Sequence, residues 1–364
     1  MAYAAAADTI RIATFQPELV RSGPGLLLRD ITMGEDPQIK ATLDLIVRAM
    51  PDVLVLTAFD FDYDQIALSA FVQNLAASGL EYPYFHAIAG NSGVFTGLDL
   101  DGNGRRGEPR DAQGYGEFAG QGALAVLSRY PILTDQIRDF STMLWRDLPD
   151  AQFPMQGGKP YPSAKVAAVQ RLSSTAHAVV PIELPDGTKL QLLMFRAGTP
   201  AFDNTVGRNR ARNSDEVLFW VRYLDGQLAL SPPASNFVVI GDANLDPADG
   251  LGNRKAIQTL ISHPKLQDPR PRSNAGQIAA EMQGGVNQSH RGDPGLDTAD
   301  WRDENGPGNL RVDYVLPSRD MTVAGSGVLW PTPQGRPVDP AGNEPRISSR
   351  HGLVWVDVDW SDGE

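Results

Sequence analysis

Short apolar runs and stretches of helical periodicity alternate along the first part of the chain. β-rich runs lie at Ile10 to Phe15 and at Val53 to Leu56, and residues 37 to 50 between them carry helical periodicity. This alternation predicts a strand, a helix and a second strand. The same reasoning predicts a helix at Gln65 to Ser78 and an apolar strand at Ala123 to Leu127.

The second part of the chain is richer in strands than in helices. One helix is predicted near Asn209 to Tyr223. The predicted β-rich segments are Lys165 to Leu172, Ala178 to Leu184, Leu190 to Phe195, Phe237 to Ile240, Arg311 to Leu316, Met321 to Leu329 and Leu353 to Val358. Because only some strands are joined by helical crossovers, the pattern favours an α+β fold with two packed mixed β-sheets flanked by helices.

The strand-rich segments at both ends are most economically part of one sandwich, so we expect a single domain over residues 10 to 360 after a flexible segment, residues 1 to 9. Stretches rich in Gly, Pro, Asp or Asn lie at Asn91 to Gly122, Ser273 to Asn309 and Pro331 to Pro345. We expect a loop insertion at about 91 to 122 and a long loop at about 265 to 309. Loops of this length in a compact domain are usually functional or held by something such as a metal.

Composition narrows the classes of function. The chain has 364 residues, 41% apolar and 21% charged, which is typical of a folded globular protein, and no apolar run is long enough to span a bilayer. A formal charge of −12 makes binding of long nucleic acid unfavourable unless a local basic patch reverses the field. With no cysteine, disulfides, thiolate metal sites and cysteine nucleophiles are excluded.

Residues 1 to 8 form no intact signal peptide, but Ala4 to Ala7 resemble the small-residue stretch around a signal cleavage site. This favours a secreted or periplasmic origin, with a frayed cytoplasmic terminus as the alternative. The sequence does not indicate an oligomeric state.

The segment Phe237-Val-Val-Ile-Gly-Asp242-Ala-Asn244 carries the most informative chemistry. A buried strand breaks at Gly241 and presents a carboxylate and an amide two residues apart, on one face. Such a pair can hold a hard cation or a phosphoryl oxygen. The alternative is a turn in which Asp242 and Asn244 only satisfy backbone donors.

Two further segments support a site. Arg311-Val-Asp313-Tyr314 places a carboxylate within a strand, where a charge is costly unless it is paired or bound to a metal. His351 directly precedes the last apolar strand and is the best candidate among the five histidines for a general acid or base. A lone histidine beside a strand is more often structural. This is the preferred interpretation of His177, with a place in the cleft as the alternative.

These motifs, together with Ile10-Arg-Ile-Ala-Thr-Phe and Pro51-Asp-Val-Leu-Val-Leu, occur in the order expected of the endonuclease/exonuclease/phosphatase superfamily, which the chain resembles over residues 10 to 360. The resemblance implies a four-layer α/β/β/α sandwich, an active site at one rim of the two sheets and Mg²⁺-dependent hydrolysis of phosphoesters. It makes Asp242, Asn244, Asp313 and His351 the catalytic candidates, with Mg²⁺ or Mn²⁺ as the possible cofactor. Gln16 stands where the family has an asparagine.

Three positions depart from the family pattern. Ala58 follows the second strand where the family has its metal-binding glutamate. The nearby carboxylates are Asp60, Asp62 and Asp64, which either replace it or form a solvated edge or helix cap. Arg196 stands at the position of a histidine, and Arg350 at that of the aspartate before the last histidine.

Arginine suits phosphate, which it binds through two parallel hydrogen bonds, but it cannot transfer protons. Gln16, Arg196 and Arg350 are therefore the ligand-binding candidates. The alternative is that the two arginines fill space and pair with Asp242 or Asp313.

A second candidate cation site lies in the loop Asp99-Leu-Asp101-Gly-Asn103-Gly-Arg105. Oxygen side chains at positions 1, 3 and 5, with glycine at position 6 and the carbonyl of Arg105 at position 7, match the first half of a Ca²⁺ loop. Arg110 stands at position 12, so Asp111 is expected to close the site, with Glu108 as the spare. The bound Ca²⁺ would be structural; a plain turn is the alternative.

Two readings of the function remain. In the first, a remodelled family member binds a phosphorylated or anionic small molecule, or a protein, with little or no hydrolysis. In the second, Asp242, Asn244, Asp313 and His351 support an active metal-dependent phosphoesterase with a recruited carboxylate. A purely structural component is the remaining class, and a deep polar cleft would argue against it.

Overall fold

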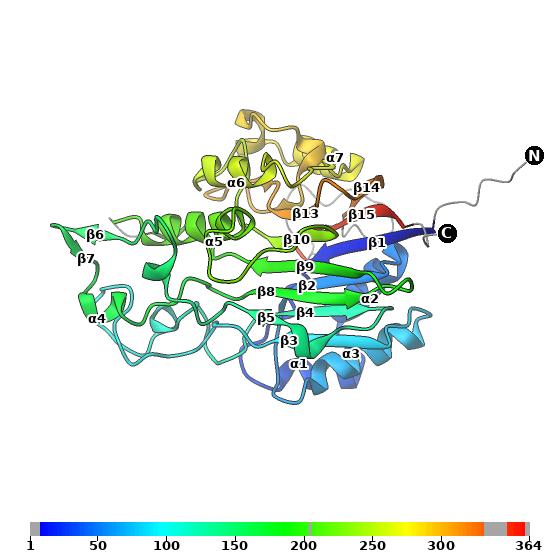
Figure 1. The fold of residues 1–364 in the computed structure, drawn as a ribbon, viewed down its shortest axis with the longest axis horizontal. Coiled ribbons are helices and arrows are strands. Elements are labelled where there is room, and N and C mark those ends of the chain that lie inside the picture. Colours follow the sequence, from blue (N-terminus) through cyan, green and yellow to red (C-terminus); the bar gives the residue numbers. More distant parts are fainter. Residues whose placement is uncertain (1–7, 204–205, 331–347, 361–364) are drawn as a thin grey trace, which may run out of the picture.

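Two large sheets form the centre of the molecule (Figure 1). This computed structural model describes residues 8–203, 206–330 and 348–360. The first sheet, in spatial order, is β14 (Val323–Leu329), β15 (Leu353–Trp360), β1 (Asp8–Phe15), β2 (Val53–Phe59), β4 (Ala123–Ser128) and β3 (Tyr84–Ile88). The second is β13 (Asp313–Pro317), β10 (Phe237–Asp242), β9 (Lys189–Arg196), β8 (His177–Glu183) and β5 (Arg138–Asp139).

Alternate side chains of the central strands face opposite layers, as the period of a strand requires. In β2, Val53 and Val55 lie in the core between the two sheets, whereas Leu54 and Leu56 pack with the helices on the outer face. Strand β10 alternates in the same way between the central core and the outer layer of the second sheet. Strands covered on both faces explain the continuous apolar runs in the sequence.

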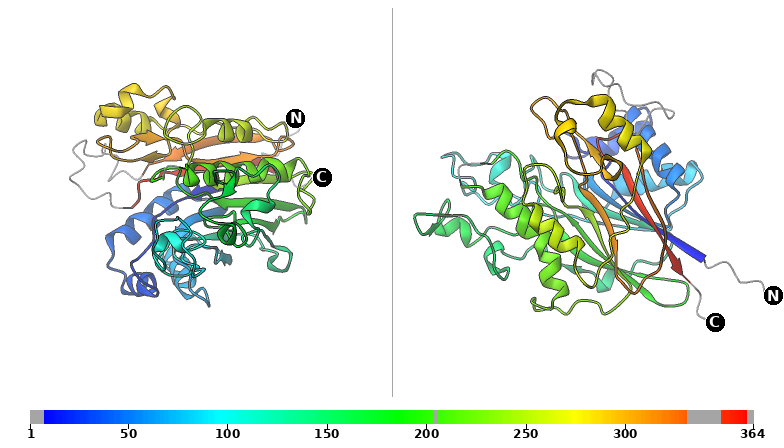
Figure 2. Two further views of the ribbon diagram at one scale, coloured as in Figure 1. Left: turned by 90° about the vertical axis from the view of Figure 1, so that its left-hand side faces the viewer. Right: turned by 90° about the horizontal axis from the view of Figure 1, so that it is seen from above.

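Helices cover the outer face of each sheet and complete the expected four-layer α/β/β/α sandwich, as the views in Figures 1 and 2 show. The first sheet packs against α1 (Leu26–Met33), α2 (Pro37–Ala49) and α3 (Ile66–Ala77). The second packs against α5 (Arg208–Leu224) and α6 (Arg254–Ile261). No helix among the described residues is long and apolar enough to cross a membrane.

Several elements differ from the sequence-based expectation. The segment Lys165 to Leu172, predicted to be β-rich, instead contains α4 (Ala164–Ala167), whose first turn is capped by the Ser163 side chain. The expected long loop at about 265 to 309 contains α7 (Asn274–Gln283) and the short ladder of β11 (Ala299–Asp300) and β12 (Asn309–Leu310). The pattern reading also missed α1, β3 and α6, and a second short ladder, β6 (Met155–Gln156) with β7 (Lys159–Pro160).

The residues on which the secretion argument rests, Ala4 to Ala7, lie outside the described part of the chain, as does the expected loop at Pro331 to Pro345.

Candidate active site

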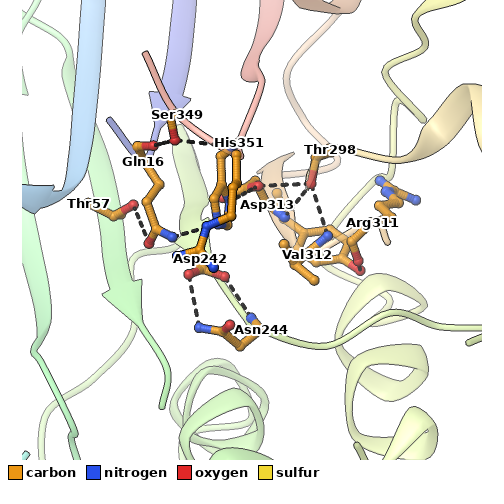
Figure 3. Close-up of polar contacts among 12 residues, drawn as sticks. Gln16, Thr57, Asp242, Asn244, Thr298, Arg311, Val312, Asp313, Ser349 and His351 are labelled. Carbon is orange, nitrogen blue, oxygen red and sulfur yellow. Dashed lines mark hydrogen bonds and ion pairs between the residues drawn. The ribbon is translucent and has the colours of Figure 1, made fainter. Parts of the chain in front are cut away.

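Two rows of side chains meet at one rim of the sandwich. In the second sheet, the strand register places Asp242 opposite Arg196 on one side and opposite Asp313 on the other. In the first sheet, Gln16 follows β1, and His351 precedes β15, which runs antiparallel to β1. The topology therefore brings together residues that are up to 335 positions apart in the sequence (Figure 3).

Asp242 and Asn244 form a compact pair at the end of β10. The Asp242 carboxylate accepts hydrogen bonds from the backbone N–H of Asn244 at 2.7 Å and from its side-chain amide at 2.9 Å. Asn244 also donates to the carbonyl of Ala197 at 2.8 Å. Glycine is required at 241, because its φ is 138° and a Cβ there would lie 1.9 Å from the carbonyl oxygen of Phe195.

Asp242 is completely buried. Burial raises the pKa of its carboxyl group, and the neighbouring charge of Asp313 raises it further, while His351 and Arg196 act in the opposite direction. An acid of this kind can hold or accept a proton near neutral pH.

His351 is held by Asp313, which itself is held by Thr298. His351 Nδ1 lies 2.8 Å from Asp313 Oδ2, and the Thr298 hydroxyl donates to the same oxygen at 2.8 Å. Thr298 Oγ1 in turn accepts the backbone N–H groups of Val312 and Asp313, each at 3.0 Å. Figure 3 shows this chain of contacts running from the β11 segment to the histidine.

The charge state of His351 is set by opposing effects. Burial lowers the pKa of its imidazole, but the carboxylates of Asp313 and Asp242 outweigh that effect, and the net direction is upward. On the other ring nitrogen, the amide nitrogen of Gln16 lies 2.6 Å from His351 Nε2. In this orientation Gln16 donates to the ring, which favours a neutral imidazole with its proton on Nδ1.

Arg196 fixes that orientation of Gln16. Its Nε donates to Gln16 Oε1 at 2.9 Å and lies 3.8 Å from Asp242 Oδ2. Gly122 lies beside both Arg196 and Ala58, since a methyl group placed on it would be 3.4 Å from Arg196 Nη1 and 3.7 Å from the Cα of Ala58. Ala58 itself forms a bulge with φ of 59° at the end of β2.

The alternative considered for both arginines was pairing with Asp242 or Asp313. Arg196 forms this ion pair with Asp242, whereas Arg350 does not. Arg350 forms an ion pair with Glu18, whose other carboxylate oxygen also accepts the Arg350 backbone N–H at 3.0 Å. Burial acts to raise the pKa of Glu18, but its hydrogen bonds to Arg350 and the charges of His351 and Arg350 outweigh burial and lower it. Half of the Arg350 side chain remains exposed.

The aspartates that follow β2 have backbone partners. Asp60 is 7% exposed and accepts the backbone N–H groups of Arg21 at 2.7 Å and Gly122 at 2.9 Å. Asp62 accepts those of Ile66 and Ala67 at the start of α3, and Asp64 is exposed. Neither Asp60 nor Asp62 lines the cleft at the rim.

That cleft has a volume of about 2130 Å³ and contains the Gln16, Arg196, Asn244 and His351 side chains. Eight arginines and seven acidic residues line it, so it carries almost no net charge although the chain carries −12. The arginines are Arg110, Arg196, Arg208, Arg212, Arg254, Arg291, Arg302 and Arg350. A polar cleft of this size argues against a purely structural role.

His177 lies away from the cleft, in the aromatic core beneath α5. It is completely buried, its Nδ1 is 2.7 Å from the hydroxyl of Ser173, and its Nε2 is 2.9 Å from the carbonyl of Glu216. Burial lowers the pKa of His177 to about 4. Its geometry agrees with the structural interpretation.

Sequence reasoning did not single out Thr298 or Glu18. Thr298 lies in a segment that was expected to be a loop, and it directly precedes β11, which the sequence pattern did not predict. Glu18 lies two residues after Gln16, and nothing in its local sequence indicates that it faces Arg350.

The predicted Ca²⁺ loop brings Asp99, Asp101 and Asp111 together, with one ligand atom of each within 4.8 Å of the others. Asp111 is fully buried and accepts the backbone N–H of Leu100 at 2.9 Å. Asn103 Oδ1 accepts the backbone N–H of Arg105 at 2.7 Å. These aspartates form a group that could bind a metal ion.

Two packed mixed sheets between helical layers, with Asp, Asn, Asp and His side chains at one shared rim, define a protein with a deoxyribonuclease I-like fold. A family model described as "Endonuclease/Exonuclease/phosphatase family" matches residues 32–351, and the chain therefore belongs to this family. The members of the family are phosphoesterases, and they generally use divalent metals.

One solved structure supports this fold. An endonuclease/exonuclease/phosphatase protein from Beutenbergia cavernae DSM 12333 is similar with a TM-score of 0.53 and 16% identity, over 97% of this chain and 72% of that one. Sphingomyelinase C from Streptomyces griseocarneus (TM-score 0.49, 15% identity, 96% and 99% covered) and a 3'-5' exonuclease from Neisseria meningitidis (0.49, 14%, 96% and 100%) are also similar. The search of curated proteins found no match.

The residues at the rim do not fit the divalent metal of the family. Arg196, a permanent cation, lies 3.8 Å from Asp242 and contacts Gln16, and the neighbouring Ala58 offers only a methyl group. Among the described residues, the group around Asp99 alone brings three acidic ligand atoms within 4.8 Å of one another. A second positive charge beside Arg196 would be repelled.

Proposed function

We propose that this protein binds a phosphorylated or anionic ligand at the rim of the sandwich, with little or no hydrolysis. The observation that carries this proposal is the position of the Arg196 guanidinium, which contacts Gln16 and approaches Asp242 where the family binds its metal. Arg196 therefore supplies the positive charge to which a phosphoryl oxygen would bind. A phosphorylated small molecule, or a phosphorylated or acidic segment of a protein, fits this chemistry.

The Arg196 side chain is 27% exposed and lines the cleft, so a ligand can reach it. Asn244 and Gln16 supply amide groups at the same rim, and Arg350 lies at its edge with half of its side chain exposed. A phosphate bound here would contact Arg196 first, because Arg350 is already paired with Glu18.

The proposed lack of hydrolysis follows from two missing functions, a metal-binding carboxylate and a proton-transferring histidine. The rim offers no carboxylate at position 58, and Arg196 cannot exchange a proton as a histidine can. Removing one member of a catalytic unit can cost as much as removing several, so the residues that remain need not provide residual activity.

An active phosphoesterase is the second candidate, and the observation that favours it is the intact pair of Asp313 and His351 beside Asp242. The raised pKa of Asp242 suits it to accept a proton from water near neutral pH. This reading requires a carboxylate from elsewhere, or catalysis in which Arg196 replaces the metal.

Measurements of binding and turnover on the same preparations separate the two candidates. Isothermal titration calorimetry with inorganic phosphate compares the wild-type chain with Arg196→Gln and with Arg48→Gln, a surface control on α2. Turnover is followed on an aryl phosphodiester and an aryl phosphomonoester with Mg²⁺, Mn²⁺ or Ca²⁺, beside an Asp242→Ala control.

We expect phosphate to bind the wild type and the Arg48→Gln variant equally, and the Arg196→Gln variant at least about tenfold more weakly, since a charge-assisted hydrogen bond contributes roughly 1.5–3 kcal/mol. Turnover should not exceed that of the Asp242→Ala control with any metal. Metal-dependent turnover that Asp242→Ala abolishes would contradict the proposal and support the second candidate.

We also propose that the group of Asp99, Asp101 and Asp111, with Asn103 and the Arg105 carbonyl, binds a structural Ca²⁺. Hard oxygen ligands at this loop spacing are typical of Ca²⁺. The carboxylates of Asp99 and Asp101 accept local backbone N–H groups but keep further lone pairs for a cation. Such an ion would order the insertion without replacing the missing ligand at Ala58.

A further inference from the structure

An apolar surface lines the cleft beside His351. Trp301, Leu310 and Val312, together called the apolar wall, line the cleft and pack with the buried Ala299. This small cluster is separate from the three large cores of the sandwich. Leu310 and Val312 are 7% and 1% exposed, whereas Trp301 is half-buried, so the indole supplies most of the wall that a ligand can touch.

The backbone fixes the position of the apolar wall. Ala299 of β11 lies opposite Leu310 of β12 in the short ladder. The Trp301 backbone N–H donates to the carbonyl of Gly308 at 3.1 Å, and the Trp301 carbonyl accepts the side-chain amide of Gln283 at 2.8 Å. The chain itself therefore holds the wall in place, and a ligand does not have to order it.

Direct contacts join the apolar wall to the proposed anion site. The rings of Trp301 and His351 are nearly perpendicular, at 85°, with their centroids 5.4 Å apart. His351 Nε2 lies 2.6 Å from the amide nitrogen of Gln16, and Gln16 Oε1 accepts a hydrogen bond from Arg196 Nε at 2.9 Å. Because Gln16 and His351 link the guanidinium group to the indole, one ligand of modest size can contact both.

Arg196 and the apolar wall suit different parts of a ligand. A guanidinium group binds a phosphoryl group through charge-assisted hydrogen bonds. The indole gains favourable free energy when an apolar ring removes its surface from water. A polar alcohol such as glycerol would instead lose hydrogen bonds to water against this wall. The two surfaces together therefore fit an anion that carries an apolar ring.

We propose that the ligand is a small phosphoryl compound whose organic group is an apolar ring, and that this ring lies against Trp301. The ring is attached to an anion that Arg196 holds, so this inference rests on the proposed function and adds the organic part of the ligand. Trp301 is then the residue that determines specificity, whereas Arg196 supplies affinity for the phosphoryl group.

Calorimetric titration of the full chain with phenylphosphonate and methylphosphonate tests the proposal. The two compounds share the same anionic head, and at a pH at which both carry two charges a difference in affinity reports on the organic group. A phosphoesterase does not hydrolyse their P–C bond, so the comparison holds whether or not the protein turns over phosphoesters.

The variants are Trp301→Ala, Trp301→Phe and Arg196→Gln. Trp301→Phe retains an aromatic ring at the wall. Trp355→Phe is the matched control, because Trp355 packs against the Arg11 guanidinium group and does not line the cleft.

We expect phenylphosphonate to bind the wild type about tenfold more tightly than methylphosphonate, because stacking on an aromatic side chain has an effect of this order. In Trp301→Ala the two affinities should become equal, with that of methylphosphonate unchanged. Trp301→Phe and Trp355→Phe should keep most of the preference. Arg196→Gln should weaken the binding of both compounds.

Heteronuclear NMR of the wild type locates the ring without depending on the stability of Trp301→Ala. The indole N–H signal of Trp301 is identified by its absence from the spectrum of Trp301→Phe. We expect phenylphosphonate to shift this signal and to show an NOE to it, and methylphosphonate to shift it far less.

Two outcomes overturn this inference alone. One is a wild type that binds both phosphonates equally, with both weakened in Arg196→Gln, which would leave the anion site without a role for the wall. The other is a Trp301→Ala variant in which both phosphonates lose affinity by the same factor, which would make Trp301 only a support for His351. If neither compound binds, or if Arg196→Gln leaves both affinities unchanged, the proposed function fails and this inference fails with it.

Discussion

At the scale of single residues, Arg196 determines the hydrogen bonds of its neighbours. Arg196 is a donor only, so it forces the oxygen of Gln16 toward itself and the amide nitrogen of Gln16 toward His351. The histidine then carries its proton on the side of Asp313. The same guanidinium supplies a permanent positive charge next to Asp242, which keeps this buried carboxylate from being an isolated charge.

The pH dependence of stability offers a test of the buried Asp242. Its pKa in the folded state is raised, mainly by burial and then by Asp313, so between the ordinary pKa of an aspartate and this raised value the folded state binds more protons than the unfolded state. Stability contributed by the protonated form is therefore present at low pH and is lost as the pH rises through that window.

In the Asp242→Asn variant this loss is removed. Between pH 4 and pH 8 the free energy of unfolding of the variant should gain roughly 4 kcal/mol relative to that of the wild type, because the pKa of Asp242 is raised to about 7. Urea unfolding across this range measures it, with Asp64→Asn at an exposed position as the control. A variant curve parallel to that of the wild type would show that Asp242 is charged throughout.

At the scale of elements, the carboxylates near the end of β2 and the start of α3 are occupied by backbone hydrogen bonds. The bulge at Ala58 lies at the end of β2. Asp60 then accepts backbone N–H groups from two loops, and Asp62 accepts those at the start of α3. The sequence left open whether these residues replace the missing glutamate. Their hydrogen bonds favour the alternative of a local structural role.

We expect Asp62→Ala to lower the free energy of unfolding by about 1 kcal/mol, because the first backbone N–H groups of α3 lose their acceptor. Phosphate affinity should not change. Chemical unfolding and calorimetry measure the two quantities, and Asp64→Ala, two residues further on and exposed, is the matched control. A loss of phosphate or metal binding in Asp62→Ala without a loss of stability would place Asp62 in the site instead.

At the scale of the whole molecule, the cleft is close to neutral, whereas the chain as a whole is strongly negative. The cleft holds eight arginines against seven acidic residues, whereas the chain as a whole carries −12. A small anionic ligand can therefore be held locally while a long polyanion is repelled by the remaining surface.

We expect no binding of a 30-base-pair DNA duplex tighter than about 10⁻⁶ M at physiological salt, the range of nonspecific association. Fluorescence anisotropy of labelled duplex measures this, and the Arg196→Gln variant should behave like the wild type. Submicromolar binding that weakens steeply with salt would mean that the arginines of the cleft track a phosphate backbone.

Local patterns predicted the central elements of the molecule because each depends on residues close in sequence. The continuous apolar runs at Val53 to Leu56 and Phe237 to Ile240 predicted the central strands, and the helical periodicity of residues 37 to 50 predicted α2. The segment Lys165 to Leu172 was predicted wrongly, because Ser163 caps a helical turn at its start and Val166 and Ala167 are buried within that turn.

The sequence by itself determined the family, the four-layer fold and the candidates Asp242, Asn244, Asp313 and His351, since these follow from motifs of a few residues and their order. Only the tertiary structure decided which contacts the residues around them make. The pairing of Arg350 with Glu18, the contact of Arg196 with Gln16 and the hold of Thr298 on Asp313 join residues from different strands and loops. Their distances are set by strand register and sheet packing, which no local pattern contains.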